Sequence, residues 1–292
     1  MKDMLGIRHI VVGVDSAETA RAPLKTAFLI AAAQKAHVQA LHARPEPVNL
    51  QHLQDAGLAG TTVEAFRRDA AKAEEEQAQA ARDLFNQMRG TAGLAEGEGP
   101  PGPEGASARF VIASGAAGQV LAARARTADL VVLGRGRGRA DPAVTGSFQT
   151  VLTAAARPVL LAPEAPPETV GRHVVVGWND SPEAMRALSA ALPILGAAES
   201  VTVVRVVDPD TGSGGDTAPA EEFMAWHGVP CRTARVARLD GAGASLLRAC
   251  KEHDADLLVM GGSTHSRLRE LVVGGATRHV LRGAGLPVLL AH

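Results

Sequence analysis

The sequence is poor in cysteine, and this scarcity excludes two classes of protein. Its 292 residues include only Cys231 and Cys250, which form neither a CxxC motif nor a spacing that suits a zinc site. A secreted domain stapled by disulfides would carry more cysteines at closer intervals. The ten histidines include no HExxH motif. The sequence therefore predicts no structural metal and no disulfide framework, and a reduced cytoplasm fits it.

The chain also lacks an excess of charge of either sign and any long apolar run. Thirty Lys and Arg residues oppose thirty-one Asp and Glu residues, so no broad basic field is available for nucleic acid or an anionic membrane. No apolar run approaches the roughly 20 residues that a transmembrane helix needs, and the first six residues lack the apolar region of a signal peptide. Hydrophobic residues nevertheless make up 46%, which is typical of a globular protein. We expect neither nucleic-acid binding nor membrane insertion.

What the sequence does contain is an internal duplication. Three short apolar segments recur in the same order in its two halves, and such self-similarity predicts two copies of one structural unit. We expect two domains, residues 1–163 (the first repeat) and residues 171–292 (the second repeat), joined by a semi-rigid proline-rich linker. The recurring pairs are Arg8–Asp15 with Arg172–Asn179, Ala128–Val132 with Ala255–Val259, and Arg157–Ala162 with Leu286–Ala291.

Within each repeat, short buried-strand patterns alternate with helical patterns, which predicts βαβ units and a parallel sheet. The fold class is therefore α/β, with five strand patterns in the first repeat and helices between them. For the sheet of each repeat we take the strand order 3-2-1-4-5, with helices on both faces. The first repeat is longer because of an insertion, which we assign to a polar helix over residues 61–89 and a flexible Gly- and Pro-rich loop over 90–105. Its fourth strand leads through a glycine-containing loop to a helix predicted over 148–156.

A sheet of this order binds ligands outside the carboxyl ends of its strands, between strands 1 and 4. Asp15 ends strand 1 and would accept hydrogen bonds from a ribose or an adenine amine. The loop from Gly134 to Ser147 follows strand 4, and glycines and helix-start amides suit phosphate. Two other interpretations stay open: Asp15 as a turn or helix-capping residue, and the loop as an ordinary connector. Arg135, Arg137 and Arg139 could clamp phosphate, but a solvated basic loop explains them better.

These segments together resemble the universal stress protein family, with two such domains in tandem. The resemblance rests on Ile10–Asp15, Ala128–Gly134 with Gly146-Ser147, and their counterparts in the second repeat, Val174–Glu183 and Met260–Gly275. It implies two Rossmann-like domains of the adenine nucleotide alpha hydrolase-like type. It also implies ATP as a ligand, with or without Mg, since some members bind ATP through a G-x2-G-x9-G-[ST] loop after strand 4.

The resemblance further implies which residues would hold the nucleotide. In the first repeat, Asp15 would contact the nucleoside, Ala43 would border the adenine, and the loop would surround the phosphates. This loop is one residue shorter than the family spacing. In the second repeat, Asn179 replaces the acidic residue and Thr264 the second glycine, so a degenerate site is expected there. The implied site residues are Gly13, Asp15, Ala43, Gly134, Gly138, Gly146 and Ser147, and more weakly Asn179, Val206, Gly261, Gly274 and Gly275.

Three functions compete at this point. The leading hypothesis is a cytoplasmic stress-response protein whose first repeat binds ATP or a related adenine nucleotide. The second is a nucleotide-free interaction module. Slow ATP hydrolysis ranks last, because the sequence offers no base to orient a water. We also expect the last strands, 158–162 and 287–291, to pair and form an internal pseudo-dimer, because exposed edge strands are a liability. A homodimer is a further expectation.

Overall fold

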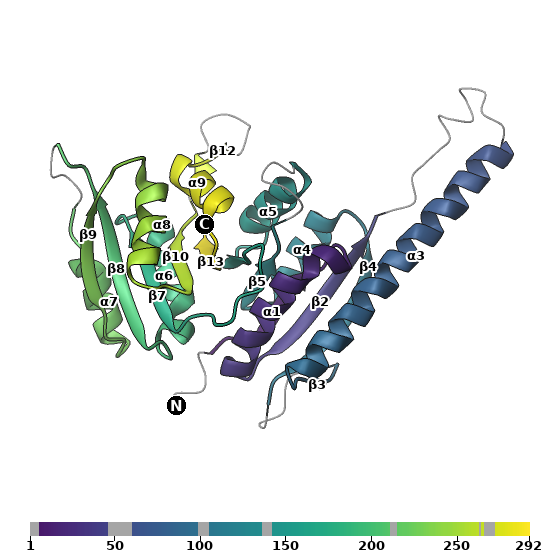
Figure 1. Ribbon diagram of the computed structural model, residues 1–292, viewed down its shortest axis with the longest axis horizontal. Coiled ribbons are helices and arrows are strands. Elements are labelled where there is room, and N and C mark those ends of the chain that lie inside the picture. Colours follow the sequence, from purple (N-terminus) through teal and green to yellow (C-terminus); the bar gives the residue numbers. More distant parts are fainter. Residues whose placement is uncertain are drawn as a thin grey trace.

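A computed structural model describes residues 6–45, 60–98, 105–135, 142–210, 215–262, 264–265 and 272–292. Among these residues, eleven strands form one continuous sheet with helices on both faces (Figure 1). The first repeat contains β1 His9–Gly13, α1 Ala17–Gln34, β2 His37–Arg44, α3 Gly60–Thr91, β3 Ala95–Glu96, β4 Ser107–Ser114, α4 Ala117–Ala125, β5 Leu130–Leu133, α5 Pro142–Ala154 and β6 Val159–Leu161. The second contains β7 His173–Trp178, α6 Pro182–Leu195, β8 Ser200–Val207, α7 Ala218–Trp226, β9 Arg232–Ala237, α8 Ala242–Glu252, β10 Leu257–Gly261, β11 Thr264–His265, β12 Val272–Val273, α9 Gly275–Gly283 and β13 Val288–Ala291.

The strand order within each repeat is the one that the sequence predicts. The first repeat runs β4-β2-β1-β5-β6 and the second runs β9-β8-β7-β10-β13, which is 3-2-1-4-5 in both cases. All pairings within these two sets are parallel. The order therefore reverses between β1 and β5, and again between β7 and β10. These are the two crevices where an open sheet of this kind receives a ligand.

The two repeats meet through their last strands. β6 pairs with β13 in antiparallel fashion, with Leu160 opposite Leu289, and both side chains are fully buried. Each strand thereby covers the edge of the other, which removes two exposed edges from the molecule. The expected pairing of the last strands is confirmed.

The hydrophobic core forms two layers, one on each face of the shared sheet. One layer lies beneath α1, α3 and α6 and continues from the first repeat into the second. The other lies beneath α4, α5, α8 and α9. In the first layer Phe28 of α1 meets Phe85 of α3 edge-on, with ring centroids 5.9 Å apart. Alanine-rich helices suit this arrangement because small side chains let a helix approach a sheet closely.

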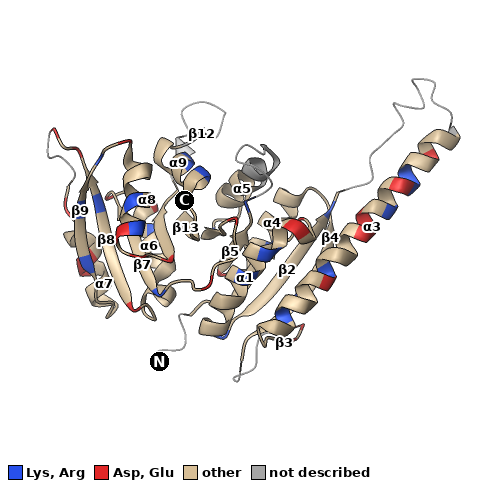
Figure 2. Cartoon of the chain, viewed as in Figure 1, with Lys and Arg blue, Asp and Glu red and all other residues tan. Residues whose placement is uncertain are grey.

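The inserted segment of the first repeat differs in part from expectation. Helix α3 runs from Gly60 to Thr91, close to the predicted range, and carries both signs of charge along its length (Figure 2). The predicted flexible loop over 90–105 is wrong in part, because Ala95–Glu96 forms strand β3 beside β4. Leu94 is buried, and Arg89 donates a 3.1 Å hydrogen bond to its carbonyl. Residues 99–104 of that loop lie outside the described residues.

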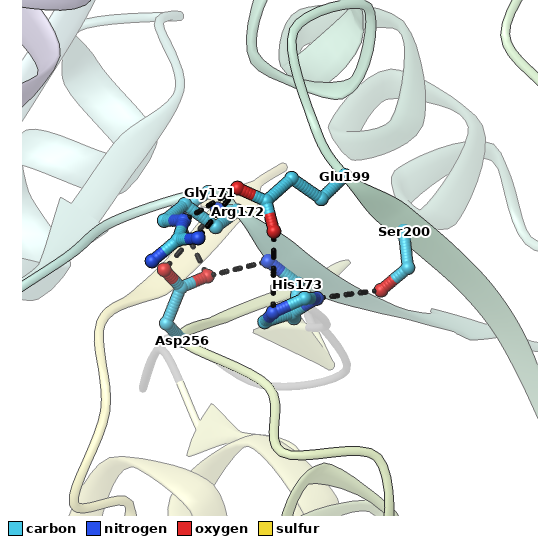
Figure 3. Close-up of polar contacts among 6 residues, drawn as sticks. All are labelled: Gly171, Arg172, His173, Glu199, Ser200 and Asp256. Carbon is cyan, nitrogen blue, oxygen red and sulfur yellow. Dashed lines mark hydrogen bonds and ion pairs between the residues drawn. The ribbon is translucent and has the colours of Figure 1, made fainter.

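In each repeat, an aspartate joins the amino ends of the two strands that flank the crevice. Asp129, before β5, accepts hydrogen bonds from the amides of Arg8 and His9 at 2.8 and 2.9 Å. Asp256, before β10, accepts from the amides of Gly171, Arg172 and His173 at 3.0 to 3.1 Å (Figure 3). The duplicated Ala-Asp-Leu motif thus has a structural reason: it locks strand 4 to strand 1 and sets the geometry of the opposite, carboxyl edge.

Candidate functional site

The first crevice lies at the carboxyl ends of β1 and β5. Strand β1 ends at Gly13, and Asp15 follows as an exposed residue. Ser16 occupies the N-cap position of α1, and its side chain makes no capping hydrogen bond. The side-chain amide of Gln77, on α3, donates a 2.8 Å hydrogen bond to the carbonyl of Asp15. The inserted helix therefore reaches the crevice, a contact that the polar pattern of α3 did not reveal.

The end of β2 supplies the neighbouring wall. Ala43 is half-buried and lies opposite Ala113 of β4, one residue before β2 ends at Arg44. Arg44 forms an ion pair of 2.6 Å with Glu75 of α3, although both side chains stay partly exposed. Glu75 belongs to the acidic run Glu74–Glu76, a kind of run that usually forms a solvated helix face. Two side chains of α3, Gln77 and Glu75, thus contact the carboxyl ends of β1 and β2.

The first glycine of each loop has a packing role that needs no ligand. A Cβ at Gly134 would lie 3.3 Å from Pro23 Cγ and 3.4 Å from the carbonyl of Thr19, both on α1. At Gly261 the corresponding Cβ would lie 2.7 Å from the backbone nitrogen of Ala184 on α6. In both repeats the first helix therefore presses against the residue that ends or follows strand 4, and only glycine leaves room for it.

Gly13 is explained in the same way. A Cβ there would lie 3.1 Å from Leu133 and 3.2 Å from Leu121, so the residue admits side chains of β5 and α4. Gly177 has the matching environment in the second repeat, with Leu246 at 3.1 Å. Close packing by neighbouring leucines therefore explains these two glycines without a bound nucleotide.

Helix α5 begins earlier than the sequence predicts. It starts at Pro142 instead of residue 148, so Gly146 and Ser147 lie in its second turn and are not at its amino terminus. The predicted loop from Gly134 to Ser147 includes Pro142, but proline is favoured at the first position of a helix because its missing N–H needs no partner there. Gly138, with Arg137 and Arg139, lies outside the described residues.

The two repeats also correspond differently from the sequence-based pairing. The bonds Ala155 N to Val151 O and Ala284 N to Val280 O are equivalent, as are Pro158 and Pro287 before the last strands. Counting back from them matches Gly146 with Gly275 and Ser147 with Ala276. The loop motif alone would match Gly146 with Gly274 and Ser147 with Gly275, and this matching is shifted by one residue. The error arose because the first loop is shorter and its helix is longer.

The second crevice is arranged otherwise. Asn179 is exposed, but its side-chain oxygen accepts two hydrogen bonds from Ser181. The Oγ of Ser181 donates at 2.8 Å and the backbone amide of Ser181 at 3.3 Å. Ser181 in turn caps α6. Val206 is half-buried on β8. Asn179 is thus engaged in starting a helix, which weakens its candidacy as a nucleoside ligand.

The loop of the second repeat brings a helix start to the crevice. Gly274 is the N-cap of α9 and Gly275 its first residue, with open space where a Cβ of Gly275 would lie. Thr264, in place of the second glycine, is used in a short antiparallel ladder and lies opposite Val273. The amides of the first turn of α9 therefore remain available for an anion. The residues before them are fixed by the pairing of β11 with β12.

Arg135 is not the solvated loop residue that the sequence suggested. It is half-buried, and its Nε donates to the carbonyl of Ala162 at 3.2 Å. Its Nη1 donates to the carbonyl of Leu281, on α9 of the other repeat. Burial lowers the pKa of the guanidinium, and Glu164 in the linker opposes that shift. No sequence signal could reveal this contact, because its partner is a backbone carbonyl 146 residues away.

The described ranges of the chain lack two further features. No cluster of three or more His, Cys, Asp or Glu side chains is placed to hold a metal ion in that part of the chain. Nor does any helix described here combine the length and the apolarity of a membrane span.

Comparison with known proteins bears on both repeats. The model of the Universal stress protein family matches residues 6–163 and again residues 171–292. A universal stress protein of Synechocystis sp., Slr1230, is 44% identical over 48 residues, which cover 16% of this chain and only 17% of that protein. A solved universal stress protein from Archaeoglobus fulgidus superposes with a TM-score of 0.67 at 15% identity, covering 97% of each chain. A putative one from Pseudomonas aeruginosa gives 0.56 at 19% identity, covering 98% and 93%; at such identities the likeness concerns the fold.

Proposed function

Because the chain belongs to the universal stress protein family, we propose that it is a cytoplasmic stress-response protein whose first repeat binds ATP or a related adenine nucleotide. The two family matches also support the proposed domain boundaries, 1–163 and 171–292. The nucleotide lies in the crevice between β1 and β5, with its nucleoside beside Asp15 and Ala43.

The observation that carries this proposal is the difference between the two residues that follow strand 1. Asp15 places a carboxylate in an exposed position at the first crevice. Asn179, at the matching position, binds Ser181 through its side-chain oxygen. A carboxylate accepts hydrogen bonds from ribose hydroxyls more strongly than an amide does, because the bond is charge-assisted. The first repeat is therefore the better nucleoside site.

The phosphates are held one turn earlier than the family spacing implies. Since α5 starts at Pro142, the helical amides without intrahelical partners belong to residues 143 and 144. An anion is favoured there by these donors and by the helix dipole. Gly146 and Ser147 follow inside the helix, so their backbone amides serve the helix itself. Any Mg would accompany the phosphates.

A nucleotide-free interaction module is the alternative that specific observations favour. Gly13 and Gly134, two of the implied site residues, are already required by packing against α1, α4 and β5. Residues of this kind would be present in a family member that had lost its ligand. The internal pseudo-dimer and any homodimer would then be the functional assembly.

One experiment separates these functions. The purified, denatured protein is analysed by mass spectrometry for nucleotide that copurifies with it, and the native protein is heated with and without millimolar ATP-Mg. The proposed function predicts bound adenine nucleotide or a clear thermal shift. Absence of both would favour the interaction module.

A further inference from the structure

One contact that the proposed function leaves unexplained joins the two repeats. Arg135 is the second residue after β5, at the start of the first candidate phosphate loop, yet it contacts α9 of the second repeat. Its Nη1 donates to the carbonyl of Leu281, and its Nε donates to the carbonyl of Ala162 at the end of β6. One guanidinium therefore joins the loop start, the paired last strands and a helix of the other repeat.

The chemistry of the Leu281 carbonyl makes this contact favourable. Helix α9 ends at Gly283, so Leu281 is in its last turn, where carbonyls have no partner within the helix. The negative end of the helix dipole is also there, and a guanidinium stabilises it. Because Arg135 is half-buried, water competes weakly for both groups. The bond thus supplies a partner to a carbonyl that α9 cannot satisfy by itself.

The second repeat makes the matching contact without a side chain. The residue equivalent to Arg135 is Gly262, and the residue equivalent to Leu281 is Leu152 of α5. A Cβ at Gly262 would lie 3.3 Å from Leu152 Cδ2 and 3.3 Å from the carbonyl of Ala291. The amide of Gly262 donates to that carbonyl at 2.8 Å, the role that Arg135 Nε plays at Ala162. Each loop start thus touches the last turn of the other repeat's helix, but only Arg135 does so through a charge.

We propose that Arg135 is a positioning residue that couples the first crevice to helix α9, so that ordering the start of the first loop also orders the end of α9. Because α9 begins at Gly274-Gly275 in the second crevice, the two crevices are linked through one helix. The coupling runs in both directions by thermodynamic necessity. Its response to nucleotide rests on the proposed function, whereas the mechanical link between the repeats does not.

A third donor on the same side chain connects the link to a ligand. Arg135 Nη2 is buried, and no residue in the described part of the chain accepts a hydrogen bond from it. A buried donor of this kind is costly unless an acceptor reaches it. An anionic group bound at the first loop would supply one and would fix the guanidinium against α9.

The test without ligand is a double-mutant cycle followed by hydrogen exchange of the full chain. Arg135→Ala removes the link, and Arg282→Gly loosens the last turn of α9 at an exposed position. The matched control is Arg157→Ala, because Arg157 also donates to a backbone carbonyl, that of Arg126, within the first repeat. We expect Arg135→Ala to speed exchange at the end of α9 by roughly 5-fold or more, and Arg157→Ala to leave it unchanged.

The cycle then decides the coupling. Arg282→Gly should speed exchange at the amide of Ala162, beside the first loop, only while Arg135 is present, so the two changes are non-additive. Additive effects, or unchanged exchange at α9 in Arg135→Ala, would overturn the proposal. ATP-Mg should slow hydrogen exchange at the end of α9 in the wild-type protein but not in the Arg135→Ala variant. A wild-type protein that binds no nucleotide would refute the proposed function, while the ligand-free cycle would still decide the link.

Discussion

Gln77 donates a hydrogen bond of 2.8 Å to the backbone carbonyl of Asp15, which ties the inserted helix to the segment that follows strand β1. Helix α3 is also packed against α1 through Phe85 and Phe28. Helix α3 therefore lies beside the first crevice, which gives the insertion a testable role.

Replacing Gln77 with alanine should weaken nucleotide binding without unfolding the protein. The bond fixes the backbone that carries the Asp15 carboxylate, and a lost neutral hydrogen bond is worth about 1 kcal/mol, or roughly 5-fold in affinity. The control is Gln79→Ala, because Gln79 donates only to Asp83 within α3. Equal affinities of the two variants, measured by titration calorimetry with ATP-Mg, would show that α3 does not support the site.

The packing account of the loop glycines predicts a graded loss of stability. Gly261→Ala should destabilise the protein by about 1–3 kcal/mol, because its Cβ would lie 2.7 Å from the backbone of α6. Gly134→Ala should cost less, since its nearest neighbour is at 3.3 Å. Gly275→Ala, with open space around it, serves as the control and should be nearly neutral. Urea unfolding measures all three, and a Gly261→Ala protein as stable as the control would contradict this account.

Acid should destabilise the first repeat through His37. Burial first, then His9 and Arg109, lower the pKa of His37 from 6.5 to about 4, and its Nδ1 lies 2.8 Å from Ser107 Oγ. Because the unfolded chain binds a proton at higher pH than the folded one, the free energy of unfolding should fall as pH drops from 6.5 towards 4. The loss attributable to His37 is at most about 3 kcal/mol.

His37→Asn should remove that part of the pH dependence, whereas the exposed His253→Asn should not. Urea unfolding at pH 7 and pH 4.5 gives the comparison. A wild-type stability that rises on acidification, or a slope that His37→Asn leaves unchanged, would show that His37 does not act in this way.

Much of the fold was predictable because it is encoded in local, repeated patterns. The buried apolar runs predicted the five main strands of the first repeat, and their recurrence predicted a second copy. The resemblance to the family implied five parallel strands in each copy. Strand β3 was missed because its two residues are a strand only through pairing with β4, which the Gly- and Pro-rich composition does not show. The start of α5 was missed because Pro142 was taken as a loop residue, although proline also suits a first helical turn.

The candidate site was less predictable, since its contacts join distant parts of the chain. The sequence singled out Asp15 and Gly134, which adjoin the crevice. It did not reveal Gln77, whose side chain looks like any solvated residue of a polar helix. It did not reveal the role of Arg135 either, because both acceptors are backbone carbonyls and leave no side-chain signature.

The early start of α5 gives a different expectation for Ser147 from that of the family spacing. A hydroxyl that holds phosphate contributes about 1.5–3 kcal/mol, so its loss would weaken binding more than tenfold. Because Ser147 lies in the second turn of α5, we expect Ser147→Ala to weaken ATP-Mg binding by less than about threefold. Calorimetry of this single variant decides between the two, and a loss above tenfold would restore Ser147 to the phosphate site.

The central claim is one adenine-nucleotide site per chain, in the first repeat, with Asp15 as its nucleoside ligand. Calorimetric titration of ATP-Mg into the wild-type protein, Asp15→Ala and Asn179→Ala tests it most directly. The account predicts a stoichiometry of one, a loss of about tenfold or more in affinity for Asp15→Ala, and no change for Asn179→Ala. Two equal sites, or binding that survives Asp15→Ala and disappears with Asn179→Ala, would contradict it.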